Sequence, residues 1–434
     1  MQPLRGLRLA GRRPGLAHHL GASRPAHERS YRVLTYPTDL NSDEQELART
    51  RLRELAEKLT ADGILRSPQW REVFERTWRH PYVPSYYPEL GAPCLLSIDP
   101  VRRAEWLAAV YSDQTLITKV IQMPLSRSLR PGAQPMFTSS STLPALLLTM
   151  LEALEVTDGC RVLEIGTGSG YNAALLCERL GSEHVTSVDI DPELVDLARE
   201  RLAANGYTPT LAAVDGDGGY PERAPYDRII ATCSVPAVPP AWLEQAAPGG
   251  MIMVDVRGKI DGTVVRLTAD GAGTATGHFL PGYGSFMPLR HTLDFPPPDS
   301  VWETDDEPVD SVSQVDPAEL QYGNEFGFVV QWHLPDVTWS PATEDGQPGV
   351  HLRAPDGSRA SVYGTQTDGG FRVSQGGPRR LWDRVEEAHT FWQESGRPSS
   401  ERFGITATAT EQYVWYDHPD SEHRWPLPAP QPAE

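Results

Sequence analysis

The stretch Val162-Leu-Glu-Ile-Gly-Thr-Gly-Ser-Gly-Tyr171 decides the fold of this chain. An apolar run containing one acid is followed by three glycines at alternate positions, and a helix-like run then extends from Asn172 to Leu180. The pattern predicts a strand, a tight turn and a helix. Glycine in the turn permits positive φ and removes Cβ atoms that would block the close approach of a ligand to the backbone.

The spacing of the glycines indicates the class of ligand. Dinucleotide-binding turns read G-x-G-x-x-G and hold a pyrophosphate, whereas this turn reads E-x-G-x-G-x-G, which suits a nucleoside without phosphates. The turn resembles motif I of class I methyltransferases, which bind S-adenosylmethionine. The resemblance implies that cofactor contacts come from Glu164, Gly166, Thr167, Gly168, Gly170 and Tyr171.

Strand-like and helix-like runs alternate around this motif. Strands are predicted over 161–165, 185–189, 210–214, 226–232, 251–256 and 263–267, and helices over 171–180, 192–204 and 241–247. The alternation predicts an α/β fold of the class I methyltransferase kind, with a doubly wound, mostly parallel sheet. Its ligand crevice lies beyond the carboxyl ends of the strands, where the glycine motif falls.

Acids follow these strands at positions that suit a nucleoside. Asp189 ends the second strand and can accept both ribose hydroxyls. The triplet Gly216-Asp217-Gly218 follows the third strand, where Asp217 can accept a hydrogen bond from an adenine amino group, although D-G is also a common turn. Glu164 has two open interpretations: it orients the loop or the ligand ammonium group, or it is a structural acid that receives loop backbone amides.

The N-terminal part contains helices rather than alternating elements. A helix is predicted from Ser42, with Gln45 completing a capping box, and a second from Ser67-Pro68 to near His80. A third helical pattern covers 142–158. The expected apolar faces consist of Leu47, Leu52, Leu55 and Leu59 in the first helix, and of Leu146, Leu147, Met150, Leu151 and Leu154 in the third.

The rest of the chain divides by composition. We predict a disordered tail over 1–30, an N-terminal helical and insertion region over 31–140, the cofactor-binding domain over 141–290, an acidic Pro-rich linker over 291–319, and a Trp-rich C-terminal α+β domain over 320–434. In the last of these, strands are expected over 326–333, 350–353, 360–363 and 404–416, with a helix over 380–392. Its tryptophans are expected to be core residues.

The amino-acid composition limits the classes of binding partner and the cellular location to be expected. The 434 residues carry a formal net charge of −19, which argues against binding to a nucleic-acid backbone. Four scattered cysteines do not form a disulfide framework, and Cys177 and Cys233 are predicted to be buried thiols, which fits a cytoplasmic location. The Arg-rich N-terminus lacks the apolar region of a secretory signal, and no run is long enough to span a membrane.

The motifs around the glycine turn resemble a narrower family, the protein L-isoaspartyl O-methyltransferases. The resemblance covers about 75–290 and rests on the glycine motif, Gly216-Asp217-Gly218, Ala224–Ile230, Ala247–Gly250, Phe286–Leu289, and the upstream runs Arg79–Pro84 and Tyr111–Gln114. It implies S-adenosylmethionine as cofactor, methyl transfer to a carboxylate, and N-terminal helices that cover the cofactor site.

The family element T-I-S-x-P corresponds here to Ser140-Ser-Thr-Leu-Pro144. Its serine, which in the family lies at the substrate carboxylate, is replaced by Thr142, so the resemblance implies Thr142 and the adjacent Ser141 as catalytic-site residues. The alternative role for Thr142 is a helix N-cap two residues before Pro144. A carboxylate is already ionised near neutral pH and needs no base, so catalysis rests on alignment and partial desolvation. His80, the nearest candidate base, is better explained as a helix-end residue.

The length of the chain bears on the choice between three hypotheses of function. The repair enzymes of the family are shorter, and the insertion at 85–140 and the region 290–434 are additional to their length. The long form resembles the branch associated with ribosomally made peptides such as lanthipeptides. The first hypothesis is therefore methylation of an Asp side chain in a constrained, modified precursor peptide, which leads to succinimide and isoaspartate. The second is repair of isoaspartate in damaged proteins, and the third is a cofactor-binding scaffold. The C-terminal region is expected to hold the substrate, so that deleting 296–434 abolishes peptide activity but not cofactor binding.

Overall fold

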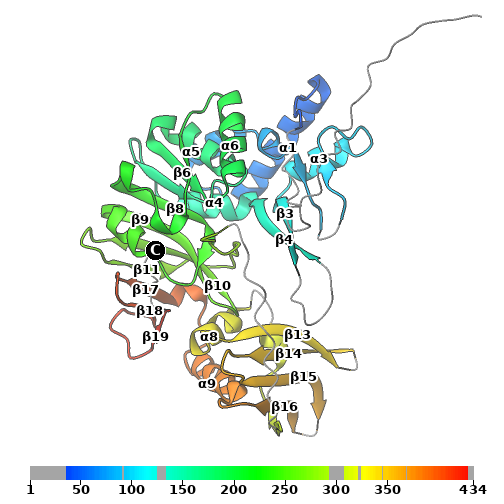
Figure 1. Ribbon diagram of the computed structural model, residues 1–434, viewed down its shortest axis with the longest axis vertical. Coiled ribbons are helices and arrows are strands. Elements are labelled where there is room, and N and C mark those ends of the chain that lie inside the picture. The colour runs from blue at the N-terminus through cyan, green and yellow to red at the C-terminus, as the bar shows by residue number, and fades with distance from the viewer. Residues whose placement is uncertain are drawn as a thin grey trace, which may run out of the picture.

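The computed structural model describes residues 36–89, 92–124, 133–292, 307–320, 324–344, 346–367 and 369–428. A ten-stranded mixed sheet forms the main body, and a five-stranded sheet forms a smaller unit below it (Figure 1). The predicted tail over 1–30 lies outside the described residues. No helix among the described residues is long and apolar enough to cross a membrane.

The parallel half of the large sheet confirms the predicted doubly wound topology. Its strands lie in the order β9-β8-β5-β6-β7, and every neighbouring pair is parallel. The strands are β5 (Val162–Ile165), β6 (Val185–Asp189), β7 (Thr210–Ala213), β8 (Tyr226–Val235) and β9 (Ala246–Arg257), and the helices are α4 (Pro144–Ala153), α5 (Tyr171–Leu180), α6 (Pro192–Ala204) and α7 (Pro240–Gln245). The order reverses at β5, so the glycine turn after β5 lies at the topological switch point.

The antiparallel half recruits strands from the C-terminal region. From β9 the order continues through β10 (Gly262–Ala269), β11 (Ala275–Phe279), β17 (Phe403–Ala407), β18 (Gln412–Tyr416) and β19 (Arg424–Pro426). The predicted domain over 320–434 is therefore not separate throughout, because β17 pairs with β11 along four residues. Figure 1 shows these last strands, in red, beside β11.

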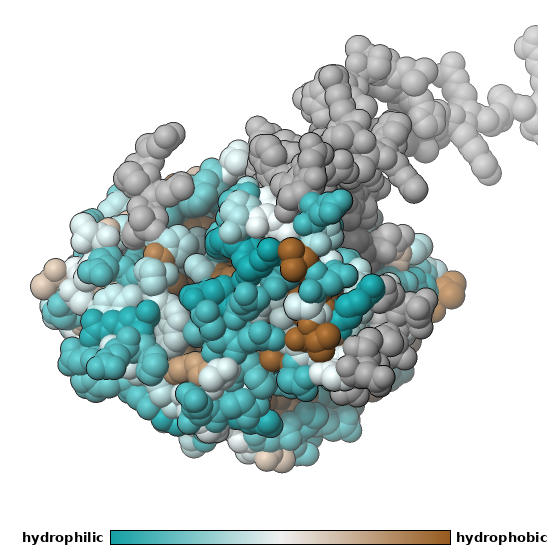
Figure 2. Space-filling view, turned by 90° about the horizontal axis from the view of Figure 1, so that it is seen from below, coloured by the Kyte–Doolittle hydropathy of each residue, from teal (hydrophilic) through white to brown (hydrophobic). Residues whose placement is uncertain are grey.

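The smaller unit is inserted between β11 and β17. Its five strands lie in the order β12-β16-β15-β14-β13, all antiparallel: β12 (Val309–Ser313), β13 (Thr338–Glu344), β14 (Gln347–Arg353), β15 (Arg359–Thr367) and β16 (Gly370–Gly376). Helices α8 (Glu325–His333) and α9 (Leu381–Glu394) lie beside this sheet, with α8 nearer to the main body (Figure 1). Seen from below, the face of the molecule is mainly hydrophilic with scattered apolar residues (Figure 2).

Two expectations for this unit were wrong. Residues 326–333 lie in helix α8 rather than in a strand. Every residue from Phe326 to Trp332 is buried, and an apolar run without a polar face shows no period that separates a helix from a strand. The linker predicted over 291–319 contains β12, whose residues pair with β16. The remainder of that range from 293 to 306 lies outside the described residues.

The N-terminal region packs helices and a hairpin against the parallel half. It contains α1 (Ser42–Ala61), α2 (Pro68–Arg76), η2 (His80–Tyr82), β1 (Ser85–Tyr86), β2 (Leu95–Leu96), α3 (Arg103–Val110), β3 (Leu116–Pro124) and β4 (Ala133–Ser141). The capping box of α1 is Asn41 with Glu44, one residue earlier than predicted with Ser42 and Gln45. Leu47 is exposed, so the buried face of α1 is formed by Ala48, Leu52, Leu55, Ala56 and Leu59.

Short 3-10 helices complete the connections. They are η3 (Ser182–His184), η4 (Gly216–Gly218), η5 (Pro221–Arg223), η6 (Pro317–Leu320) and η7 (Ser400–Arg402). The prediction of buried thiols is confirmed for Cys177 and Cys233, and all four cysteines are free. Among the C-terminal tryptophans, Trp332, Trp382 and Trp415 are buried, as expected, while Trp339, Trp392 and Trp425 are partly buried against the same core.

Candidate active site

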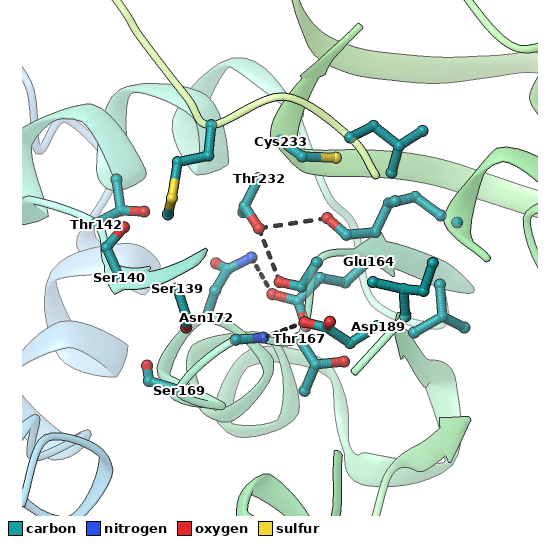
Figure 3. A pocket seen from close by; sticks show the side chains of 18 of the residues that line it. Ser139, Ser140, Thr142, Glu164, Thr167, Ser169, Asn172, Asp189, Thr232 and Cys233 are labelled. Carbon is teal, nitrogen blue, oxygen red and sulfur yellow. Dashed lines mark hydrogen bonds between the residues drawn. The ribbon is translucent and has the colours of Figure 1, made fainter. Parts of the chain in front are cut away.

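A cavity lies at the carboxyl ends of the parallel strands, where the glycine turn, β4 and a late loop meet (Figure 3). We call residues 164–172 with 188–190 the glycine wall, residues 138–142 the hydroxyl wall, and residues 284–290 the closing segment. The lining residues come from these three parts and from Gly216, Thr232, Cys233 and Leu147. The structure thus brings every predicted site residue except Gly170, Asp217 and Gly218 to the cavity lining.

The glycines of the turn adopt the predicted positive φ, but for a partly different reason. The φ angles of Gly166, Gly168 and Gly170 are 96°, 50° and 90°. A Cβ on Gly166 would lie 2.7 Å from Thr232 Oγ1, and one on Gly170 would lie 3.2 Å from the Cβ of Ala198. The first and third glycines therefore allow close packing within the protein. Only at Gly168 does the surrounding space leave room for a Cβ, at 3.5 Å or more from its neighbours.

Asp189 holds the turn from the end of β6. Its Oδ2 accepts the Gly168 N–H at 2.9 Å, and its Oδ1 accepts the Asp191 N–H at 3.0 Å. Burial raises the pKa of Asp189, and the two backbone donors oppose that rise. Because each carboxylate oxygen can accept more than one hydrogen bond, Asp189 retains acceptor capacity toward the cavity for a pair of hydroxyls.

Glu164 is fully buried on β5 and faces the same cavity. Its Oε1 accepts the Asn172 Nδ2–H at 2.7 Å (Figure 3). Its Oε2 accepts the Ser187 Oγ–H at 2.5 Å. The interpretation that Glu164 receives loop backbone amides was wrong, because that role belongs to Asp189. Burial raises the pKa of Glu164 to about 7, and the hydrogen bonds from Ser187 and Asn172 offset only part of the rise.

The polar groups of the glycine wall fit a cationic, nucleoside-type ligand. Asn172 Oδ1 is buried without a hydrogen-bond partner in the described part of the chain, and its residue lines the cavity. A buried acceptor of this kind suits an N–H donor such as an ammonium group. The nearby carboxyl groups of Glu164 and Asp189 favour positive charge. The site therefore fits the sulfonium and ammonium groups of S-adenosylmethionine better than a phosphate.

Asp217 and Gly218 lie on η4 beside the cavity, and only Gly216 of this triplet is among its lining residues. The triplet is fixed from α7: Trp242 Nε1 donates to Gly216 O at 2.8 Å, and Gln245 Nε2 donates to Gly218 O at 2.8 Å. Asp217 is half-buried, and its backbone N–H donates to Asp215 Oδ1. Burial raises its pKa.

The hydroxyl wall ends at the first turn of α4, and here Thr142 is not the N-cap. Leu143 occupies that position without a side-chain cap. The turn is instead capped from a distant loop: Asp113 Oδ1 accepts the Ala145 N–H at 2.8 Å, and Thr115 Oγ1 accepts the Leu143 N–H at 3.2 Å. Thr142 is thus released from capping, and its side chain lies with Ser140 across the cavity from Glu164 and Asp189 (Figure 3).

Ser141 is held by a buried arginine that the sequence did not single out for a role. Arg79 is 1% exposed, and its Nε donates to Ser141 Oγ at 3.1 Å. Its terminal nitrogens donate to the carbonyl oxygens of Val110, Ser112, Gln114, Ser141 and Thr142. Burial lowers the pKa of Arg79 to about 10, so it remains a cation near neutral pH. Its place at the start of the run Arg79–Pro84, which resembles the family, was the sequence signal.

His80 does not serve as a base in this cavity. Its Nδ1 lies 2.6 Å from Tyr111 Oη, and its ring packs edge-on against Trp78 and Trp106. Burial lowers its pKa to about 4, so it is neutral. The helix-end interpretation was wrong, because α2 ends at Arg76 and His80 begins the separate turn η2. Within the described ranges, no group of three or more His, Cys, Asp and Glu side chains could hold a metal ion.

Comparison with known proteins gives the family. Residues 50–277 match the family described as protein-L-isoaspartate(D-aspartate) O-methyltransferase. The chain is 33% identical to the protein-L-isoaspartate O-methyltransferase of Methanopyrus kandleri over 263 residues, which are 59% of this chain and 99% of that protein. The match to the enzyme of Ignicoccus hospitalis is 47% identical over 115 residues, 26% of this chain, and spans about half of that relative, 54%.

Solved structures carry the same description. One protein-L-isoaspartate O-methyltransferase is 20% identical with a TM-score of 0.48, over 84% of this chain and 99% of the other. A second, from Plasmodium falciparum in complex with S-adenosyl-L-homocysteine, is 15% identical with a TM-score of 0.39, over 56% and 99%. The family match over 50–277 and the similarity to the Methanopyrus kandleri enzyme show that the chain belongs to the protein-L-isoaspartate(D-aspartate) O-methyltransferase family of S-adenosylmethionine-dependent protein carboxyl O-methyltransferases.

Proposed function

We propose that this chain methylates the free carboxylate of an L-isoaspartyl residue in a protein or peptide. The observation that carries the proposal is a single cavity in which the hydroxyl wall faces the glycine wall. When bound, S-adenosylmethionine supplies a methyl group on a sulfonium. Family membership, and relatives described as protein-L-isoaspartate O-methyltransferases, support this acceptor.

The glycine wall is proposed to hold the cofactor. Asp189 has acceptor capacity for the ribose hydroxyls, and Asn172 Oδ1 with Glu164 suits the ammonium group. Thr167 and Tyr171 complete the wall, with Thr167 Oγ1 2.7 Å from Ser187 Oγ. Asp217 follows Gly216 on η4 and does not itself line the cavity. It is proposed to accept a hydrogen bond from the adenine amino group at the edge of the cavity.

The hydroxyl wall is proposed to hold the acceptor carboxylate. Thr142 presents a hydroxyl that can donate to it, and Ser141, tied to Arg79, fixes the backbone that carries Thr142. No proton need be removed, because the carboxylate is ionised near neutral pH. The protein therefore contributes alignment and exclusion of water, and the neutral His80 has no part in the step.

The test compares two peptides of one sequence, with L-isoaspartate or ordinary aspartate at one position. We expect labelled methyl transfer only to the isoaspartyl peptide. Thr142→Val should lower kcat/KM about tenfold or more, because a hydrogen bond to a charged group is worth about 1.5–3 kcal/mol, whereas the matched control Thr142→Ser should keep most activity. Equal activity of the Val and Ser variants would remove Thr142 from the site.

A second acceptor deserves the same assay because of two specific features. The inserted five-stranded unit and the threonine at position 142 distinguish this chain from the short repair pattern, and they favour an ordinary Asp side chain in a constrained, ribosomally made peptide. A cyclised peptide with ordinary Asp is the third arm. Methylation of the cyclised peptide alone would replace isoaspartate by this acceptor, and no turnover on any arm would leave a cofactor-binding scaffold.

A further inference from the structure

The inserted unit touches the main body at the turn between β9 and β10. Gln331 of α8, 1% exposed, accepts the N–H of Ile260 at 2.7 Å and of Asp261 at 3.2 Å with its Oε1. The fit is close, since a Cβ on Gly258 would lie 1.9 Å from Gln331 Nε2. The helix therefore fixes the path of this turn by direct hydrogen bonds.

Arg257 carries the connection onward from that turn. Its Nη1 lies 3.4 Å from Asp261 Oδ1, and its Nε donates to Asp255 Oδ2 at 3.0 Å. Its Nη2 donates to Gly262 O at 2.7 Å and to Gly284 O at 2.6 Å. The side chain is only 10% exposed, and Asp255 is fully buried, so solvent screens this ion pair weakly. One guanidinium thus joins the turn to the closing segment.

The closing segment reaches the cavity three residues later. Asp255 Oδ2 also accepts the Phe286 N–H at 3.0 Å, so Arg257 and its ion-pair partner both hold residues 284–286. Beyond them, Ser234 N–H donates to Met287 O at 2.9 Å, and Leu289 N–H donates to Ser234 O at 2.8 Å. The cavity wall then runs from Met287 to Arg290.

The glycine wall is held mainly by other elements. Gly168 is bonded to Asp189 and Asn172 to Glu164 within residues 164–191, while Thr232 Oγ1 donates to Gly166 O and Arg201 Nη1 donates to Ser169 O. The closing segment does contact the hydroxyl wall, where Arg290 Nη2 donates to Thr138 O at 3.3 Å. A displacement of the closing segment should therefore disturb the acceptor more than the cofactor.

We propose that Arg257 is a positioning residue through which the inserted unit, by way of Gln331, sets the closing segment against the acceptor. The inference rests on the proposed function only for the identity of that acceptor. It assigns the inserted unit a role in methyl transfer without direct contact with the substrate. The inserted unit and the closing segment are coupled through the hydrogen bonds of Gln331 and Arg257, and not merely by lying close together.

The first experiment follows backbone amide exchange, which requires no substrate. Arg257→Lys and Gln331→Met should each speed exchange at Gly284 and Phe286 while the amide of Gly168 stays protected. The control Arg266→Met removes a half-exposed arginine of the next strand, paired with Glu155, and should change neither. Unchanged exchange at 284–286 in the Gln331 variant would overturn the proposal whatever the enzyme methylates.

The second experiment measures kinetics on the peptide that the wild type methylates. We expect Arg257→Lys to raise the peptide KM about tenfold, since small misplacements at a site carry such costs, with S-adenosylhomocysteine affinity within about threefold. Parallel loss of cofactor affinity would reduce Arg257 to a general structural residue. A wild type inactive on all peptides would refute the proposed function instead, and the exchange data would still decide the coupling.

Discussion

The glycine wall and the hydroxyl wall face each other across one cavity, yet they are supported in opposite ways. The side-chain bonds that shape the glycine turn join residues from Glu164 to Asp191, and Thr232 and Arg201 add bonds to its backbone. The hydroxyl wall is held from afar, by Arg79 and by Asp113, and the closing segment beside it by Arg257. The cofactor side is therefore supported mainly from within 164–232, whereas the acceptor side is supported by residues as far apart as Arg79 and Arg257.

Deletion of residues 296–434 is the change with the largest expected effect on the two walls. This removes β17 from the edge of β11 and removes Phe328 and Trp332, which pack against Phe279. We expect loss of the folded protein rather than of peptide activity alone, because exposed sheet edges and core faces drive aggregation. Solubility and S-adenosylhomocysteine binding by the truncated chain are the measurements. A soluble fragment that binds the ligand would restore the expectation drawn from the sequence.

A single substitution, Arg79→Met, tests the support of the hydroxyl wall. Arg79→Met leaves the carbonyl oxygens at 110–114 and 141–142 without their donor, and each unpaired buried group costs about 1–3 kcal/mol. We expect the free energy of unfolding to fall by at least about 3 kcal/mol, measured with urea. The control Arg53→Met removes an exposed ion pair with Glu46 and should change it by less than about 0.5 kcal/mol. Similar losses in the two variants would contradict the buried clamp.

On the other wall, Asp189→Ala should act mainly on the cofactor. It removes the acceptor of the Gly168 and Asp191 N–H groups, and bonds to a charged group contribute about 1.5–3 kcal/mol each. We expect S-adenosylhomocysteine affinity to fall about a hundredfold by calorimetry, with the fold retained. An unchanged affinity would show that the acid is only a cap of the strand end.

The smallest expected effect is a pH dependence within the glycine wall. The pKa of Glu164 is raised by burial from 4.5 to about 7, so its stabilising contribution is fully present below the lower value and is lost as pH rises through the higher. A cationic ligand favours the ionised form, so cofactor affinity should rise a few-fold between about pH 6 and about pH 8. Glu164→Gln should flatten this profile, while Asp189 and Ser187 remain as in the wild type. A slope that persists in the variant would assign it to Asp189 or another group.

The same contrast explains what could be predicted from the sequence. The strand, turn and helix of 162–180 follow from local pattern, and so do the ends of β6 and α6. Arg79 could not be assigned a role, because its acceptors lie 31–63 residues away. Helix α8 was mistaken for a strand because burial on all sides erases the helical period. The pairing of β17 with β11 has no local signal, since pairing is decided by the fold as a whole.

The insertion between β11 and β17 has a consequence for the order in which the protein folds during synthesis. The parallel half is complete once β9 has emerged from the ribosome, so the cofactor side can form early. The outer edge of β11 has no partner until Phe403–Ala407 emerges, long after β11 itself. Until then, the unpaired edge of β11 can pair with strands of other chains. The nascent chain should therefore depend most on chaperones while the inserted unit is being made.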